Sequence, residues 1–110
     1  MSLRVNAQMI GPHLLLALDG ALDLSSLPLF SDALARHLGA HTSAAIDLDG
    51  VTVLDDAAIG ILLGVATRRR EVNDPLVLVC TNPAIIGRLD KAGVNMIIPI
   101  VSSVLDIASP

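Results

Sequence analysis

Two adjacent carboxylates, Asp55 and Asp56, are the side chains of this sequence best placed to do chemistry. They follow an apolar run from Ala44 to Leu48, which predicts a strand, and lead into the stretch from Ala57 to Arg70, which predicts a helix. We expect Asp56 at the N-cap, where its carboxylate can accept hydrogen bonds from free backbone N–H groups and meets the positive end of the helix dipole. Such a junction can hold or receive a phosphoryl group, although an ordinary N-cap would also explain the aspartate.

A metal-dependent phosphotransfer site is one chemistry that these carboxylates suggest. Four of them surround the end of the same predicted strand: Asp47, Asp49, Asp55 and Asp56. Paired carboxylates there could hold Mg²⁺, as in a receiver domain that accepts phosphate on an aspartate. A receiver also needs an acidic pair after its first strand and a late lysine. Here the first predicted strand carries no carboxylate, and the only lysine, Lys91, falls inside a predicted helix, so the pattern disfavours this enzyme.

Other catalytic and metal-binding patterns are missing from the sequence. His13, His37 and His41 fall in a strand, a helix and a loop, with no carboxylate or cysteine at ligand spacing. No glycine-rich nucleotide-binding motif occurs, and no serine lies in a nucleophile elbow. We therefore expect no catalytic residue, no metal, no cofactor and no enzymatic activity.

Apolar periodicity, glycines and prolines divide the 110 residues into strands and helices of a single α/β domain, residues 1–110. The predicted strands cover Leu3 to Ala7, His13 to Leu18, Ala44 to Leu48, Leu76 to Cys80 and Asn95 to Val101. The predicted helices cover Leu27 to Leu38, Ala57 to Arg70, Pro83 to Ala92 and a short last segment that ends at Ile107. Strands that alternate with helices from residue 27 onward are typical of an α/β domain with parallel strands.

The helix that follows Asp56 is apolar over an unusually wide arc. Ile59 and Leu62 fall on one side of it, and Ile61 and Val65 fall on another. An arc of this width predicts burial on more than one face, or a surface kept for a partner. The expected core of the domain consists of Leu14, Leu16, Leu18, Ile46, Leu48, Leu62, Val77, Val79, Leu89 and Ile98.

Composition narrows the range of partners and compartments. A net charge of −4 disfavours binding to nucleic acid, which needs a basic surface, and a single Phe without Trp or Tyr provides little stacking area for bases. The longest uncharged helical run, Ala57 to Thr67, is too short for a bilayer, which takes about 20 residues. The first residues lack an apolar signal core, so the cytoplasm is the expected location. Cys80 cannot form an internal disulfide and is expected to be a small buried apolar residue.

The stretch from Asp49 to Gly60 resembles the signature of the STAS domain, the family of bacterial anti-sigma factor antagonists. Asp19 to Asp23 resembles the Gly-Glu-Leu-Asp turn of the family. Further segments resemble its C-terminal third: Asn82 to Leu89, Ala92 to Val94 and Ile97 to Ile100. The resemblance spans about residues 3 to 108. It implies a small mixed β-sheet with about four helices packed on it.

The resemblance also assigns a role to the acidic pair. The family signature reads Asp-Ser-(Ser/Thr)-Gly-Leu-Gly, and its first serine is phosphorylated by a partner anti-sigma kinase. Asp55 stands at the family's aspartate and Asp56 at the phosphorylated serine, while Ala57 and Ala58 replace the second hydroxyl residue and the glycine. An aspartate is no substrate for a serine kinase and carries about one negative charge, where a phosphoserine carries about −1.5 to −2. In this protein, the regulation that phosphorylation provides in the family is therefore either fixed in one state or located at another site.

The resemblance implies that the protein is an anti-sigma factor antagonist, which binds an anti-sigma factor and thereby releases a sigma factor. The anti-sigma factor can itself be a kinase of the anti-sigma type. The alternative is an accessory or scaffold module of a transporter or of a stressosome-like assembly. The protein can also form a homodimer in this interpretation. Neither nucleic acid nor a membrane is expected as a direct partner. The residues expected to bind the partner are Asp23, Leu54, Asp55, Asp56, Ala57, Ala58, Ile59, Ile61 and Gly64.

Overall fold

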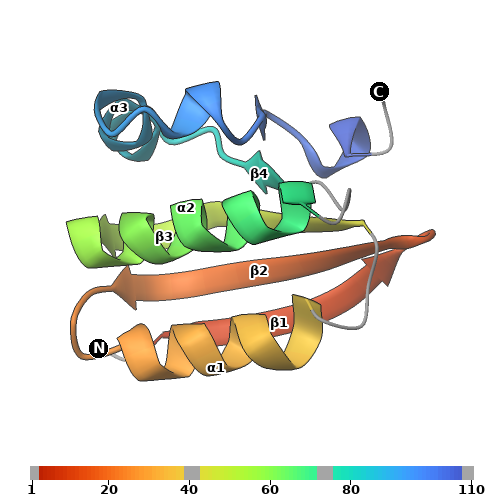
Figure 1. Ribbon diagram of the computed structural model, residues 1–110, viewed down its shortest axis with the longest axis horizontal. Coiled ribbons are helices and arrows are strands. Elements are labelled where there is room, and N and C mark those ends of the chain that lie inside the picture. The colour runs from red at the N-terminus through yellow and green to blue at the C-terminus, as the bar shows by residue number, and fades with distance from the viewer. Residues whose placement is uncertain (1–2, 39–42, 72–75, 108–110) are drawn as a thin grey trace.

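A mixed β-sheet carries three α-helices in the computed structural model, which describes residues 3–38, 43–71 and 76–107 (Figure 1). The strands are β1 (Arg4–Ile10), β2 (His13–Leu22), β3 (Ala44–Leu54), β4 (Leu76–Val79) and β5 (Ile100–Val101). The helices are α1 (Leu27–Leu38), α2 (Asp56–Glu71) and α3 (Pro83–Lys91), with 3-10 turns η1 (Val94–Met96) and η2 (Val104–Asp106). The strand order is β1-β2-β3-β4-β5, with β1 antiparallel to β2 and all other neighbours parallel. The predicted α/β fold is confirmed, except that the expected fourth helix is only the short turn η2.

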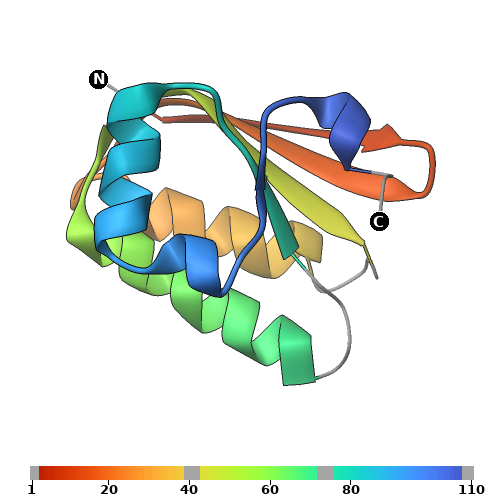
Figure 2. The same ribbon diagram turned by 90° about the horizontal axis from the view of Figure 1, so that it is seen from above.

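The main core lies between one face of the sheet and the three helices. Alternate residues of neighbouring strands point to this face, so that Leu14 and Leu16 of β2 are buried beside Ile46 and Leu48 of β3. Figure 2 shows α1 and α2 side by side across this face, with α3 next to α2. Ile59, Leu62 and Ala66 of α2 are buried in this core, which holds the helix against the sheet.

A smaller cluster covers part of the opposite face of the sheet. Leu15, Ala45 and Val79 are buried there, and Val104 and Ile107 from the C-terminal segment pack against them. All residues of the expected core are buried except Val77, which is half-buried on this face. Across the described residues, no helix combines the length and apolar character that a bilayer crossing requires.

Strand β3 continues to Leu54, although the sequence predicted its end at Leu48. Its second half pairs with the end of β2 through two shifts of register, and Gly50 faces Asp19 beside the first shift. A Cβ on Gly50 would lie 2.7 Å from the Leu18 carbonyl oxygen and still closer to the Asp19 carboxylate. The close approach therefore requires glycine. The extended strand carries the chain directly to the start of α2.

The predicted strand from Asn95 to Val101 is wrong over most of its length. The chain forms η1 after Gly93, which has a φ of 78°, and only the last two residues pair with β4 as β5. Val94 and Ile98 are both fully buried, four residues apart. The N–H groups of Ile97 and Ile98 both donate to the Val94 carbonyl, at 2.9 and 2.8 Å, so the segment closes a helical turn instead of pairing with β4.

Candidate protein-interaction surface

The acidic pair lies at the junction between β3 and α2. Helix α2 begins at Asp56, so the N-cap position belongs to Asp55, and the expected N-cap is wrong by one residue. The Asp55 carbonyl accepts hydrogen bonds from the N–H groups of Ala58 at 3.0 Å and Ile59 at 3.2 Å. The Asp55 N–H donates to the Leu22 carbonyl at 2.9 Å, which fastens the junction to the end of β2. Asp56 occupies the first turn, where its carboxylate still meets the positive end of the helix dipole.

The Asp56 carboxylate projects into solvent and contacts α3. Its side chain is 96% exposed, and its Oδ1 accepts a hydrogen bond from Arg88 Nη2 at 2.7 Å. The Arg88 side chain is itself 46% exposed. This ion pair links the first turn of α2 to the last turn of α3 at the surface. A binding partner can therefore reach Asp56 without any rearrangement of the fold.

Asp23 lies in the loop between β2 and α1, next to the acidic junction because Leu22 pairs with Leu54. Its Oδ1 accepts hydrogen bonds from the Ser25 hydroxyl at 2.6 Å and from the backbone N–H groups of Ser25 and Ser26 at 3.0 and 3.2 Å. The hydrogen bond from the Ser25 side chain is the main reason that the pKa of Asp23 lies below its usual value. The structure thus brings Asp23 to the same end of the sheet as Asp55 and Asp56.

Three of the residues expected to contact a partner are buried instead. Leu54, Ala58 and Ile59 are between 0% and 4% exposed, because their side chains pack in the main core. The expectation that they touch a partner is therefore wrong. They support the surface from beneath, while Ala57 is exposed and Ile61 and Gly64 are half-buried.

Two exposed apolar side chains near the junction were not predicted. Leu24, in the loop after β2, is 71% exposed, and Val53, near the end of β3, is 46% exposed. Both side chains add exposed apolar area to the surface around the acidic junction. The exposure of Val53 could not be predicted from the sequence, because the register shift in β3 breaks the regular alternation of buried and exposed residues.

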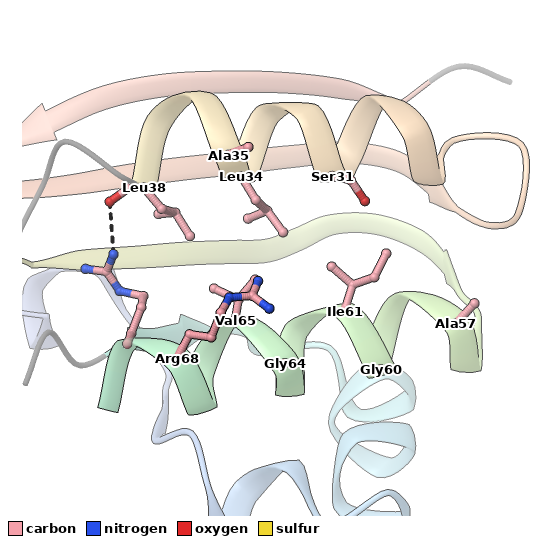
Figure 3. A pocket seen from close by; sticks show the side chains of 11 residues that line it. Ser31, Leu34, Ala35, Leu38, Ala57, Gly60, Ile61, Gly64, Val65 and Arg68 are labelled. Carbon is pink, nitrogen blue, oxygen red and sulfur yellow. Dashed lines mark hydrogen bonds between the residues drawn. The ribbon is translucent and has the colours of Figure 1, made fainter. Parts of the chain in front are cut away.

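A groove of about 720 Å³ runs between α1 and α2 (Figure 3). Apolar side chains from both helices face it, with small residues on the α2 side and two arginines at the C-terminal end of α2. It is lined by Ser31, Leu34, Ala35, Leu38, Ala57, Gly60, Ile61, Gly64, Val65, Arg68 and Arg69. The wide apolar arc of α2 indicated such a surface, but the contribution of α1 could not be read from either helix alone.

The two arginines at the end of the groove have different roles. Arg69 is buried, and its Nη1 donates a hydrogen bond to the Leu38 carbonyl at 3.0 Å, so it caps the C-terminus of α1. Arg68 is exposed and lies along α2, with its Nη1 3.8 Å from the position that a Cβ on Gly64 would take. Arg69 therefore holds the helices together, and Arg68 remains at the surface of the groove.

Asp47 and Asp49, which lie inside β3, accept hydrogen bonds and do not form a metal site. Asp49 Oδ1 accepts from the backbone N–H of Thr81 at 2.6 Å and from its hydroxyl at 3.0 Å, while Asp47 Oδ1 accepts from the N–H of Asp49 at 2.9 Å. Within residues 3–38, 43–71 and 76–107, no three His, Cys, Asp or Glu side chains are grouped to hold a metal ion. The structure therefore gives no support to the Mg²⁺ interpretation.

Cys80 follows β4 and is buried, with 2% of its surface exposed. Burial raises the pKa of its thiol above the ordinary value, because the thiolate would be poorly solvated there. The neutral thiol is the favoured form, and thiolate is the reactive species. The geometry agrees with a packing role for Cys80.

Comparison with protein families identifies the fold. The family model of the STAS domain matches residues 4–107, nearly the whole chain. This chain belongs to the STAS domain family. No curated protein matches its sequence.

Solved structures with the same fold include two anti-sigma factor antagonists and part of an anion transporter. An anti-sigma factor antagonist from Mycobacterium paratuberculosis superposes with a TM-score of 0.82 at 17% identity, covering 96% of this chain and 90% of that one. The unphosphorylated anti-sigma factor antagonist SpoIIAA gives a TM-score of 0.72 at 15% identity, covering 96% and 94%. The murine anion transporter Slc26a9 gives 0.74 at 16% identity, covering 91% of this chain but only 18% of the transporter.

The superpositions show the fold of this STAS domain but assign no role to its acidic junction. At such low identities the superpositions show the common fold. The residues that distinguish this STAS domain, among them Asp56, must therefore be interpreted from their own surroundings. Those surroundings are a solvated helix start, an ion pair with Arg88 and the adjoining α1–α2 groove.

Proposed function

We propose that this STAS domain is a non-catalytic protein-interaction module that acts as an anti-sigma factor antagonist. It binds an anti-sigma factor, and a sigma factor is released as a result. The proposal is supported by the similarity in extent and fold to two antagonists, of which this chain covers 90% and 94%. The proposed site of action is the bacterial cytoplasm, where sigma factors work.

The exposed carboxylate of Asp56 is the observation that carries this proposal. It stands at the first residue of α2, is 96% exposed, and by the resemblance described above takes the place of the phosphorylated serine. We infer that the partner contacts it directly, together with the exposed or half-buried residues around it. These are Asp23, Asp55, Ala57, Ile61 and Gly64.

A fixed carboxylate changes how such a surface is regulated. Aspartate has about half the charge of phosphoserine and one acceptor oxygen fewer, and a serine kinase cannot modify it. We infer that the partner is adapted to Asp56, because an antagonist that is permanently inactive has no evident use. Control of activity then comes from elsewhere, such as the amount of protein.

A displacement assay tests the function itself. Candidate anti-sigma factors are those encoded near the gene of this protein, and each is purified in complex with its labelled sigma factor. An antagonist is expected to displace the sigma factor in proportion to its concentration. If the domain binds none of these complexes and displaces no sigma factor, the proposal is wrong.

The alternative function is a STAS module within a transporter or scaffold assembly. It is favoured by the likeness to Slc26a9, in which the matching part is a small share of a long transporter chain. Neighbouring genes for lipid or anion transport, and co-purification with a membrane transporter, would support this alternative. Self-association in sedimentation velocity would instead indicate a homodimer.

A further inference from the structure

We propose that the α1–α2 groove binds an acidic amphipathic helix of the partner protein. This inference rests on the proposed function, because it names the chemistry of the partner segment that reaches the surface beside Asp56. The groove starts at Ala57, directly after Asp56, and ends at Arg68.

The dimensions of the groove fit a helix of about three turns. From Ala57 to Arg68 the axis of α2 rises about 16 Å, at 1.5 Å per residue. Apolar side chains at i, i+4, i+7 and i+11 of a partner helix span a similar length and can enter between Leu34 and Ile61. The volume of about 720 Å³ leaves room for several such side chains.

Small residues on α2 allow the partner to approach closely. Gly60 and Gly64 both line the groove, one turn apart on the same side of α2. No atom lies within 4 Å of the position that a Cβ on Gly60 would occupy. The packing of this domain therefore gives no reason for glycine at position 60, and the open space is available to another molecule.

The backbone chemistry of the groove favours a helix over an extended peptide. Its walls are α1 and α2, whose backbone N–H and C=O groups are already used within each helix. An extended segment would find no strand edge there to pair with its own backbone groups, and unpaired buried groups are costly. A helix satisfies its backbone internally and presents only side chains.

Charge determines the character of that helix. The lining residues include Arg68 and Arg69 but no carboxylate. Among the described residues, Arg68 takes part in neither of the two ion pairs, which join Asp32 to Arg36 and Asp56 to Arg88. An acidic side chain at one end of the partner helix would pair with Arg68, and the negative end of that helix's dipole would add to the attraction.

Selection from a helix library tests this proposal. The probe is a yeast-displayed helical hairpin with one randomised outer face, selected against the wild-type domain. Binders are then measured against Gly60→Leu, which fills the groove, and against the control Gly87→Leu. Gly87 lies in α3 outside the groove, and its Cβ position is equally free of neighbours. Both replacements raise helix propensity, so circular dichroism should show intact folds.

We expect selected helices to carry an apolar face with an acidic end and to lose about tenfold or more in affinity for Gly60→Leu, but not for Gly87→Leu. Arg68→Glu should weaken the same helices, and replacing their acidic residue by lysine should restore binding to that variant. Binders that are indifferent to Gly60→Leu would overturn the proposal. Groove-dependent binding of dodecanoate without any such helix would also overturn it, in favour of a small anionic amphiphile.

Binding measurements with the native partner distinguish a failure of this inference from a failure of the proposed function. If the anti-sigma factor binds wild type and Gly60→Leu equally well, the groove proposal fails while the function stands. If groove-dependent acidic helices are selected but no anti-sigma factor binds, the proposed function fails and the groove remains a helix-binding site.

Discussion

Asp56 Oδ1 accepts a hydrogen bond from Arg88 Nη2 at 2.7 Å, across the surface between the start of α2 and the end of α3. This pair partly neutralises the carboxylate that stands at the proposed switch position. Because both side chains remain accessible, a partner can compete for either charge. The relationship therefore links the proposed binding surface to α3 as well as to α2.

The Asp56–Arg88 pair is expected to contribute little to stability. Exposed ion pairs typically contribute about 0.2–1 kcal/mol, because water and salt screen them. A double-mutant cycle of Asp56→Ala and Arg88→Ala, measured by urea unfolding, should give a coupling free energy below about 1 kcal/mol. A coupling of several kcal/mol would mean that the pair is a structural element and not a surface feature.

Gly50→Ala should destabilise the domain. The new methyl group would overlap the Leu18 carbonyl and the Asp19 carboxylate, so that β2 and β3 must separate beside their register shift. We expect a loss of about 1–3 kcal/mol in the free energy of unfolding. The matched control is Gly60→Ala, which meets no neighbour and should stabilise the domain by about 0.4–1 kcal/mol. Equal effects of the two substitutions would refute the close approach at Gly50.

Arg69→Met should destabilise the contact between α1 and α2, while Arg68→Met should not. Arg69 is buried and donates to the Leu38 carbonyl at 3.0 Å, so its loss leaves that helix end with one partner fewer. A loss of about 1–3 kcal/mol is expected for Arg69→Met. Arg68 is exposed, and its replacement should stay within about 0.5 kcal/mol of wild type. Chemical denaturation of both variants decides between these outcomes, and the reverse order would contradict the assignment.

Cys80 should make stability fall at alkaline pH. The folded thiol has a raised pKa, so the folded state holds its proton at pH values where the unfolded chain, with an ordinary thiol pKa of about 8.5, has released it. The stabilisation is complete below the unfolded pKa and is lost as the pH rises through the folded one. Urea unfolding of wild type and Cys80→Ala between pH 7 and pH 10 should therefore show a steeper decline for wild type. Parallel pH profiles would contradict a shifted thiol.

The order of the elements could be predicted from the sequence, because the apolar periodicity and the residues that start and end helices gave strong signals. Asn82 and Pro83 start α3 as expected, with the Asn82 side chain accepting from the Ala84 N–H at 3.0 Å. Gly93 follows that helix with a positive φ. Such local signals act within a few residues, and a sequence alone can therefore reveal them.

Features that depend on distant partners could not be predicted in the same way. The second half of β3 forms because its residues pair with β2 beyond Gly50, across a register shift that breaks the alternation. The segment around Val94 is apolar enough for a strand, yet it packs as a turn on the core. The α1–α2 groove arises only when two helices lie side by side, so Leu34 and Arg69 gave no sign of it.

Partner binding through Asp56 underlies the proposed function. Its most direct test is the calorimetric affinity of the anti-sigma factor for wild type, Asp56→Ala and Asp56→Ser. A suitable control is Asp32→Ala, which removes another exposed, ion-paired aspartate, on α1. Mass spectrometry after incubation with a kinase and ATP accompanies each titration.

We predict that Asp56→Ala and Asp56→Ser each weaken binding by about tenfold or more, the value of a hydrogen bond to a charged group. Asp32→Ala should leave the affinity unchanged, and the wild type should remain unmodified at position 56. An affinity unaffected by Asp56→Ala would contradict the account and reduce Asp56 to an ordinary residue of a helix start. Tighter binding and phosphorylation of Asp56→Ser would contradict it in the opposite way, by showing that the native carboxylate holds the antagonist inactive.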